Sequence, residues 1–272
     1  IWMYSDREII RIAKKYYELG MTQKEIAEEE NLSRPTISRI LDTAHKRGFI
    51  KITINYPLKS VNDLENEFLK EFNLRKVFIT PVYVNDESII KNDVGKALSK
   101  YIKSICRHGD IIGISWGTTL AHLVENLGKI ERKDVKIVQL NGSVGRTSFS
   151  TGAMTVLEKF SNAFSAAESY VLSVPAIVDH EEIAKALMQD SQIQEILSLG
   201  RESNIAVFGI GRASEDSILY KAGYFTSEQY RDLLGQGAVG DICSRYFTIN
   251  GELCNPELNK RTIGIQLEKL KA

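Results

Sequence analysis

The stretch TQKEIAEEENLSRPTISRILDTAHKR, residues 22–47, predicts two short helices that meet at a sharp angle. Thr22 and Glu25 form a T-x-x-E capping box, in which the hydroxyl and the carboxylate each accept a hydrogen bond from a backbone N–H at the helix start. Ile26 and Ala27 follow as inward-facing residues. The polar run after them ends at Asn31, a residue that tolerates the left-handed conformation of a tight turn. This half of the stretch therefore predicts a helix that ends at a turn.

The second half of the stretch predicts a helix with one apolar side and one polar side. Ser33 is suited to cap this helix, and Pro35 lies in its first turn, where a missing N–H does no harm. The apolar stripe consists of Ile37, Ile40 and Leu41 at three- and four-residue spacing. The outer, N-terminal side is where a recognition helix reads base edges. We expect the DNA-binding residues to be Thr22, Gln23, Ser33, Arg34, Pro35, Thr36, Ser38 and Arg39.

Basic residues are concentrated in and after this second helix. Residues 33–51 contain five Lys and Arg residues and one acidic residue, Asp42. The segment therefore has a net charge of +4 in a chain of formal net charge +0. The five are Arg34, Arg39, Lys46, Arg47 and Lys51. Such an excess supplies phosphate contacts, and a few residues at the head of the helix supply discrimination. Two capped helices with a sharp turn are also compatible with a plain helical hairpin.

The composition indicates a globular chain without special chemistry of Cys or His. Its 272 residues suit about two domains, and an apolar content of 43% suffices for a sizeable core. The sequence shows neither a secretory leader nor an apolar run long enough for a membrane span, so we expect a cytoplasmic protein without membrane contact. Three Cys without a C-x-x-C pair and four scattered His argue against a disulfide framework or a metal site. We expect no metal and no cofactor.

The segments around the two helices complete a predicted winged helix-turn-helix domain over residues 1–56. Ser5 and Glu8 form another capping box, and the helix they begin is expected to end at Gly20. Its inner face is expected to consist of Ile9, Ile10, Ala13 and Tyr17. After Gly48, FIKITINYP alternates apolar and polar residues as a half-buried strand does, which we interpret as the wing.

A linker and a connecting helix are predicted over residues 57–75. Ser60 with Asp63 is suited to cap this helix. One face of it carries Val61, Leu64, Phe68 and Phe72, a stripe that packs internally or against a second subunit.

From residue 76 to 272 the pattern changes to short apolar runs separated by helical stretches. Strands are expected at Val77, Ile111, Val135, Tyr170 and Ile205, and helices at about residues 87–107 and from Thr118. Strands that alternate with helices predict a mostly parallel sheet covered on both faces. In such α/β sheets small ligands bind beyond the carboxyl ends of the strands.

The loop at residues 110–119, DIIGISWGTT, is the most informative of these strand ends. An apolar strand leads directly into Ser115, Gly117, Thr118 and Thr119. The glycine lets the backbone approach a ligand closely, and two hydroxyls and the free N–H groups of a helix start are expected to point at that ligand. This arrangement favours a phosphate cradle. It lacks the Lys of a P-loop and the three-glycine spacing of a dinucleotide site. Thr also caps helices for purely structural reasons.

Three further strand ends add glycines and polar residues to the same predicted site. They contribute Asn141 and Gly142, then Gly211, then Asp241 and Arg245. Glycines let several loops approach one point, a carboxylate accepts sugar hydroxyls, and an Arg pairs with phosphate. A sugar phosphate satisfies all of these groups. Asp241 and Arg245, four residues apart, could equally form a structural ion pair.

The order of several motifs along the chain resembles one known family. The motifs are the T-Q-x-E-I-A start after Tyr17, LSRPTISRIL, GDIIGISWGTT, VQLNG, NIAVFGIG, GYF, AVGDICSRYF and NKRTIGIQLE. The whole chain is similar to the SorC-type bacterial sugar-responsive transcriptional regulators, and especially to their deoxyribonucleoside-responsive members. The resemblance implies a winged DNA-binding domain, an effector domain similar to sugar-phosphate isomerases and deaminases, and a homo-oligomer, dimer or tetramer. It also implies that Gly117, Thr118 and Thr119 hold phosphate and that Asp241 holds the sugar.

Two departures from the family pattern limit what the resemblance implies. Deoxyribonucleoside-responsive members carry a Lys able to form a Schiff base where this chain has Asn141, so a covalent imine is excluded there. The amide of Asn141 can still hydrogen-bond a hydroxyl. Family chains also continue past the RTIG strand into a segment with a basic residue, so we expect a C-terminally shortened fold without that phosphate-contacting Lys.

These observations favour a sequence-specific repressor of a carbohydrate or deoxynucleoside catabolic operon, controlled by a phosphorylated sugar and bound to double-stranded operator DNA. Whether the effector induces or co-represses is left open. The alternative is a sugar-phosphate isomerase or deaminase-like enzyme with an appended DNA-binding domain. Catalysis needs a positioned base and acid, and the loops offer Asp241 but no His or Lys, so we expect no enzyme and no catalytic residue. An architectural DNA-binding protein would leave the glycine loops unexplained.

Overall fold

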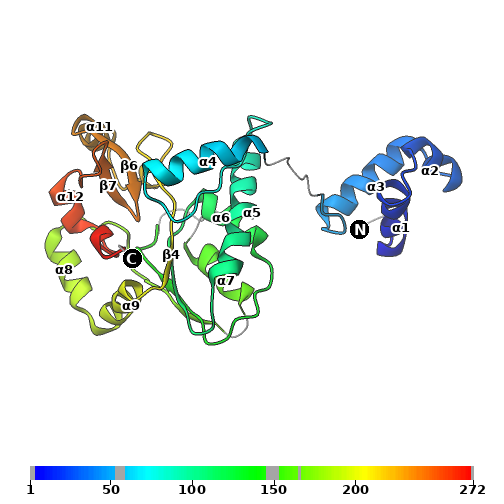
Figure 1. Cartoon of the computed structure of the whole chain (residues 1–272). Coiled ribbons are helices and arrows are strands. Elements are labelled where there is room, and N and C mark those ends of the chain that lie inside the picture. The colour runs from blue at the N-terminus through cyan, green and yellow to red at the C-terminus, as the bar shows by residue number, and fades with distance from the viewer. Residues whose placement is uncertain (1–3, 53–58, 145–152, 165–166, 271–272) are drawn as a thin grey trace. The chain divides into compact units, whose positions relative to one another are not determined.

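The computed structural model describes residues 4–52, 59–144, 153–164 and 167–270 of the chain. The chain divides into two compact units, Ile1–Ser60 and Val61–Ala272, each with its own hydrophobic core (Figure 1). Within the described residues, no helix is long and apolar enough to cross a membrane.

Three helices form the N-terminal unit, and the predicted caps begin all of them. Their bounds are α1 Asp6–Tyr17, α2 Gln23–Glu29 and α3 Arg34–Lys46. Ser5 and Thr22 both form complete capping boxes, and the side chain of Ser33 accepts from the N–H of Thr36. Asn31 has a φ of 52°, which is the left-handed conformation predicted for the turn between α2 and α3. Local sequence therefore sets where each of these helices starts.

The core of this unit confirms the stripe on α3 and corrects the predicted face of α1. Nine side chains are buried together: Ile9, Ile12, Ala13, Ile26, Ala27, Ile37, Ile40, Leu41 and Ala44. Ile10 and Tyr17 were expected inside but are exposed, and Ile12 takes their place. Helices α2 and α3 cover only part of the broad apolar face of α1, the part that carries Ile9, Ile12 and Ala13.

The predicted wing lies mostly outside the described residues. Gly48 ends the helical segment with a φ of 74°. Residues 49–52 form no strand, and the rest of the predicted strand falls on residues that are not described.

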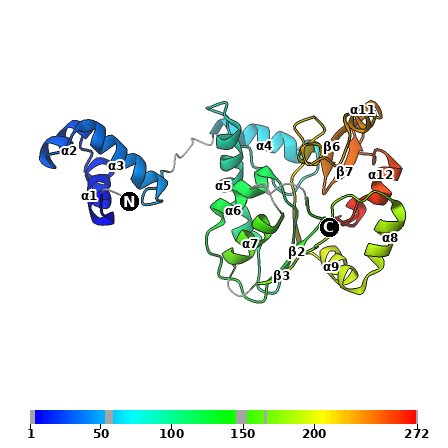
Figure 2. The same ribbon diagram turned by 180° about the vertical axis from the view of Figure 1, so that it is seen from behind.

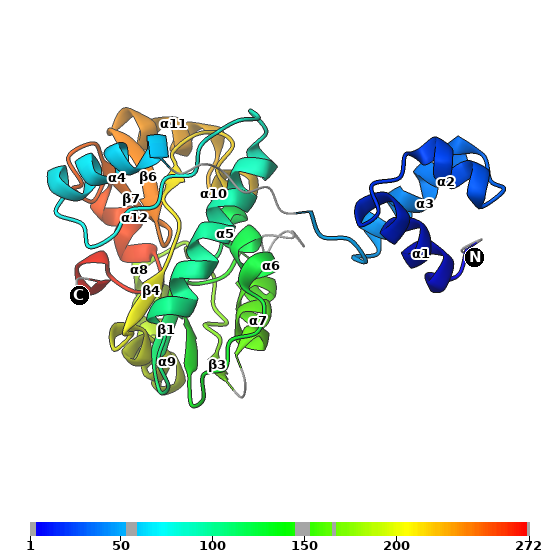
Figure 3. The same ribbon diagram turned by 45° about the vertical axis from the view of Figure 1, so that its right-hand side comes forward.

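The larger unit is built around a four-stranded parallel sheet with strand order β3-β2-β1-β4. The strands are β1 Ile111–Ile114, β2 Lys136–Gln139, β3 Glu168–Tyr170 and β4 Ile205–Val207. Helices α5 Glu87–Ile105, α6 Thr118–Leu127 and α7 Ala153–Ala163 cover one face, and α8 Glu181–Gln189 and α9 Ser191–Arg201 cover the other (Figures 1 and 3). This three-layer arrangement confirms the predicted α/β fold.

The sheet departs from the prediction at its start. Residues 77–80 form no strand, although their short apolar run predicts one. Instead, the backbone N–H of Ile79 donates to Oε1 of Glu65 at 2.8 Å. Glu65 belongs to the connecting helix α4 Lys59–Glu71. The predicted cap at Ser60 depends on a side chain that lies outside the described part of the structure.

A second, antiparallel sheet follows β4 and was not predicted. It consists of β5 Gly211–Arg212, β6 Ala238–Ile242 and β7 Arg245–Thr248, in the order β5-β6-β7. Helices α10 Ile218–Lys221, α11 Ser227–Gly235 and α12 Pro256–Arg261 accompany it, and a 3-10 helix, Leu267–Leu270, follows (Figure 2). Its core combines aliphatic side chains with the fully buried aromatic residues Tyr230 and Tyr246.

Candidate functional site

The strand order places a crevice between the carboxyl ends of β1 and β4. From β1 the chain runs outward through β2 and β3, and then returns to add β4 on the other side of β1. In open α/β sheets such a reversal leaves room for a ligand, because the two loops leave the sheet on opposite sides. A cavity of about 770 Å³ lies at this place. Its volume is in the range of small-molecule sites.

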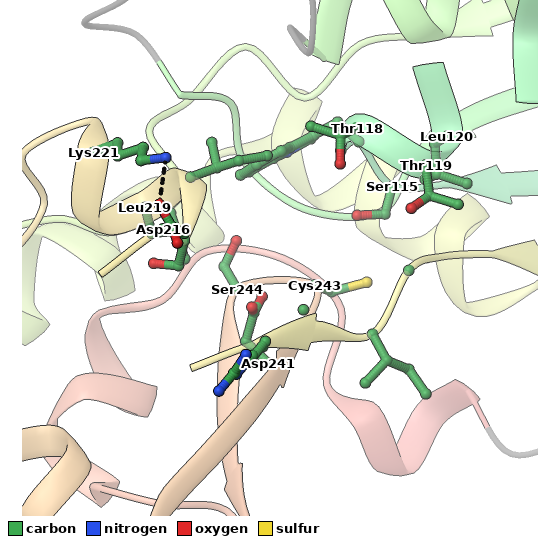
Figure 4. Close-up of a pocket in the computed structure, with 18 of the residues that line it drawn as sticks. Ser115, Thr118, Thr119, Leu120, Asp216, Leu219, Lys221, Asp241, Cys243 and Ser244 are labelled. Atoms are coloured by element: carbon green, nitrogen blue, oxygen red, sulfur yellow. Dashed lines mark ion pairs between the residues drawn. The ribbon is translucent and has the colours of Figure 1, made fainter. Parts of the chain in front are cut away.

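The cavity collects most of the loops that the sequence singled out (Figure 4). Of the nine predicted effector-binding residues, seven line it: Ser115, Gly117, Thr118, Thr119, Asn141, Gly211 and Asp241. Gly142 and Arg245 do not. Further lining residues that the sequence reasoning missed include Glu87, Lys91, Trp116, Asp216, Ser217 and Lys221.

The N-terminus of α6 forms one end of the cavity. Gly117 has a φ of 145°, which L side chains rarely adopt, and it offers no side-chain cap to the helix. The backbone N–H groups of the first helical turn have no intrahelical acceptor. Thr118 and Thr119 add two hydroxyls beside them. This end of the cavity therefore presents hydrogen-bond donors and the positive end of a helix dipole, which suits an anion.

Three buried polar side chains form the floor. Ser115 Oγ donates to Asn141 Oδ1 at 2.8 Å, and Asn141 Nδ2 donates to Ser244 Oγ at 2.9 Å. Asn141 is 1% exposed and lies after β2, whereas Ser244 lies in the turn between β6 and β7. Both turn residues, Cys243 and Ser244, have positive φ, the conformation of a two-residue hairpin. Asn141 thus joins the two sheets, and its amide is already engaged with both serines.

A carboxylate stands beside this floor. Asp241 lies opposite Gly211 in the antiparallel pairing of β5 with β6. Burial raises the pKa of Asp241 from 3.8 to about 6, and the backbone N–H of Ser244 partly offsets this by favouring the charged form. A carboxyl group in this position accepts hydrogen bonds from hydroxyls of a ligand.

Two lysines reach the cavity from helices and not from loops. Lys91 Nζ, on α5, donates to Thr118 Oγ1 at 2.6 Å and also pairs with Glu87. Lys221, at the end of α10, pairs with Asp216 at 2.9 Å (Figure 4). The strand-end loops contain no Lys, but the cavity is still lined by Lys, because α5 packs against α6 and brings Lys91 to the cavity.

Arg245 is not where the prediction put it. The side chain is 4% exposed and its guanidinium donates to the backbone carbonyls of Asn259, Thr262, Gly264 and Ile265. All of its hydrogen bonds therefore hold the C-terminal segment, and no ion pair joins it to Asp241 among the described residues. Gly142 is packed as tightly: an added Cβ would lie 2.4 Å from the carbonyl oxygen of Pro175. Both residues stabilise the fold around the cavity.

The three cysteines are free and buried, as expected. Cys243 lines the cavity, and burial raises its thiol pKa to about 12, so the thiol stays protonated. Across the described residues, no cluster of His, Cys, Asp and Glu could hold a metal ion.

The predicted DNA-reading residues lie on the accessible side of the N-terminal unit. None of the eight is buried, and Arg34 and Arg39 are fully on the surface of α3. Two of the five basic side chains of residues 33–51 are paired with acidic residues. Lys46 pairs with Asp42 at 2.7 Å, and Arg47 pairs with Asp6 at 2.8 Å. Among the described residues, the members of this basic group without an ion pair are Arg34 and Arg39 on α3 and Lys51 after it.

A helix-turn-helix unit joined to an α/β unit with a polar, ligand-sized cavity defines a ligand-responsive transcriptional regulator. Residues 4–51 match the family model of the winged helix-turn-helix DNA-binding domain, and residues 56–272 match the Sugar-bind family model, which describes a sugar-binding domain. The chain belongs to the SorC family of sugar-binding transcriptional regulators.

Named relatives agree with this assignment. The chain is 32% identical to the deoxyribonucleoside regulator of Bacillus subtilis (strain 168), over 96% of this chain and 83% of that protein. It is 31% identical to the sorbitol operon regulator of Klebsiella pneumoniae, over 97% of this chain and 84% of that protein. The crystal structure of the full-length Klebsiella regulator, SorC, superposes with a TM-score of 0.74 over 98% of this chain and 86% of that one. These relatives are regulators and not enzymes.

Proposed function

We propose that the cavity binds a phosphorylated sugar and that this binding controls the affinity of the N-terminal unit for operator DNA in the cytoplasm. The proposal rests on one observation. The same cavity is lined by a helix N-terminus at Gly117, which favours an anion, and by the carboxylate of Asp241, which can accept hydrogen bonds from hydroxyl groups. A sugar alone would place no anion at the helix terminus, and a phosphate alone would place no hydroxyl group at Asp241.

The operon is proposed to serve carbohydrate or deoxynucleoside catabolism, in keeping with the names of the relatives. An effector that weakens DNA binding must itself be bound more weakly in the DNA complex, because the coupling is reciprocal. A coupling of about 1 to 3 kcal/mol, or roughly five- to 150-fold in affinity, is ordinary for such systems.

The first experiment measures ligand binding to the purified chain by isothermal titration calorimetry. The panel contains 2-deoxyribose 5-phosphate, fructose 6-phosphate and fructose 1,6-bisphosphate, each beside the free sugar and beside orthophosphate. Binding of one sugar phosphate at least tenfold tighter than both its free sugar and orthophosphate supports the proposal. Equal affinity for a sugar and its phosphate contradicts the role of the helix terminus.

The second experiment tests DNA recognition. Duplexes selected from a random pool by the wild-type chain serve as the operator, and fluorescence anisotropy gives the affinity as a function of salt. Arg34→Ala and Arg39→Ala are expected to weaken binding, and each phosphate contact that is lost lowers the slope of log K against log salt by about 0.9. Lys185→Ala is the control, because it removes one positive charge from an exposed site in the other unit. An unchanged affinity in both arginine variants would exclude α3 as the recognition helix.

The regulator is also proposed to act as a homo-oligomer, dimer or tetramer. Helix α4 exposes Leu64 and Phe68, and the residue that follows it, Phe72, is exposed as well, at 43%, 41% and 60% respectively. A contiguous apolar patch of this kind marks an interaction surface, and a symmetric reader of operator half-sites needs a second copy. Sedimentation equilibrium should give a dimer or larger for the wild type and a smaller species for Phe68→Glu/Phe72→Glu. A monomeric wild type would refute it.

A further inference from the structure

The ammonium group of Lys91 lies in an electrostatically unusual place. It donates to Oγ1 of Thr118, the first residue of α6, at 2.6 Å. The first turn of a helix carries partial positive charge, so a cation there is disfavoured unless an anion accompanies it. A lysine and a helix N-terminus therefore face the same part of the cavity.

Glu87 is the anion that compensates Lys91 in this structure. The two residues pair one turn apart on α5. Their environments differ, because the Lys91 side chain is 21% exposed and the Glu87 side chain is 82% exposed. The hydrogen bond from Lys91 lowers the pKa of Glu87, while the charge of Asp216 opposes this. An exposed carboxylate that is screened by water and repelled by Asp216 is a weak partner for a partly buried ammonium group.

Thr118 links this pair to the cavity. Its hydroxyl oxygen accepts from Lys91, so its own hydrogen is directed elsewhere and can be donated. Lys91, the Thr118 hydroxyl and the backbone N–H groups after Gly117 thus offer donors from two helices. A tetrahedral dianion with three peripheral oxygens matches this set better than a planar carboxylate, which has two.

We propose that Lys91 is an effector-binding residue, which exchanges Glu87 for the phosphate monoester of the ligand held at the N-terminus of α6. This inference rests on the proposed function and adds to it the cation that binds the phosphate. The exchange releases the Glu87 carboxylate in the first turn of α5. Glu87 accordingly competes with the ligand for Lys91.

The variants Lys91→Gln and Glu87→Gln have opposite expected effects. Lys91→Gln removes the positive charge. For each sugar phosphate that the wild type binds, this variant should have an affinity at least tenfold lower, while its affinity for the free sugar should be unchanged. Glu87→Gln removes the carboxylate that competes for Lys91, and it should raise the affinity for the same sugar phosphate about two- to fivefold. Lys96→Gln, on the same helix but paired with Asp93 away from the cavity, is the control and should leave binding unchanged.

Calorimetry with the sugar phosphates and free sugars named above decides among the outcomes, after circular dichroism shows that each variant is folded. If the wild type binds a sugar phosphate and Lys91→Gln binds it equally, the inference fails and the proposed function stands. If Lys91→Gln lowers the affinity for the free sugar as much as the affinity for the sugar phosphate, Lys91 does not bind the phosphate group. If Glu87→Gln weakens binding, Glu87 is a ligand-binding residue and the exchange is refuted. If the wild type binds no sugar phosphate, the proposed function fails and the inference with it.

Discussion

A Cβ atom on Gly211 would lie 2.1 Å from Oδ1 of Asp241. The two residues face each other across β5 and β6, so the carboxylate occupies the space that only a glycine leaves open. Gly211→Ala is expected to push the Asp241 side chain out of its place. Because φ at Gly211 is not in the left-handed region, the backbone itself tolerates alanine.

We therefore expect Gly211→Ala to reduce sugar-phosphate affinity at least tenfold and to lower the melting temperature only slightly. Titration calorimetry and thermal unfolding measure the two effects. Gly235→Ala is the matched control, since an added Cβ there meets nothing within 4 Å. Unchanged affinity in Gly211→Ala would mean that the position of Asp241 does not matter to the ligand.

Asp241 should make the stability of the larger unit depend on pH. Its pKa is raised by burial from 3.8 to about 6, so folding favours the protonated carboxyl group. That contribution is fully present below pH 3.8 and is lost as the pH rises through 6. A shift of this size corresponds to about 2 to 3 kcal/mol at most.

Asp241→Asn remains neutral and escapes this loss. The free energy of unfolding of Asp241→Asn, relative to wild type, should rise between pH 4.5 and pH 7.5 and then level off. Urea unfolding at several pH values measures it, with Asp232→Asn on the exposed side of α11 as the control. A difference that stays constant across this range would show that Asp241 titrates normally.

Arg245 is expected to stabilise the fold and not to bind the ligand directly. Arg245→Met would leave the carbonyls of Asn259, Thr262, Gly264 and Ile265 without their donor. Unsatisfied buried acceptors predict a loss of about 2 to 4 kcal/mol in the free energy of unfolding. Arg231→Met, at an exposed arginine with one hydrogen bond to Ser227, should cost far less. Equal effects in urea unfolding would contradict the structural role.

Glu30 ties α1 to α2 in the DNA-binding unit. Both carboxylate oxygens accept from Arg11, and Lys15 donates to one of them at 2.6 Å. The hydrogen bonds from Arg11 and then Lys15 lower the pKa of Glu30 from 4.5 to about 2. The associated stability is present above pH 4.5 and is lost as the pH falls towards 2.

Glu30→Gln is therefore expected to destabilise the N-terminal unit at pH 7 by about 1 kcal/mol, after allowance for the half-exposed Arg11. The difference from wild type should shrink as the pH falls from 4.5 to 3. Thermal unfolding followed by circular dichroism measures it, and Glu28→Gln, at an exposed site on the same helix, is the control. A penalty of undiminished size at pH 3 would argue against the ion pairs as its cause.

Sequence was a good guide where the interactions lie within a few residues of one another. The boxes at Ser5 and Thr22, the cap at Ser33 and the left-handed Asn31 are all as predicted. It was a poorer guide where an amphipathic face is broader than the surface that covers it, as at Ile10 and Tyr17, which are exposed. The segment 77–80 has the apolar pattern of a strand, but it forms none in the described structure, and the backbone N–H of Ile79 bonds to the side chain of Glu65 instead.

The sequence by itself determined the helix-turn-helix, the four strands of the parallel sheet, and the loops that gather at the candidate site, because caps, turns and periodicity act between near neighbours. Only the tertiary structure decided which polar residues face the cavity. An added Cβ on Gly95 would lie 2.8 Å from the carbonyl oxygen of His122, so α5 and α6 approach closely enough for Lys91 to reach Thr118. Packing of the C-terminal segment places the guanidinium of Arg245 among backbone carbonyls and not in the cavity. These contacts join residues far apart in the chain, and no local pattern specifies them.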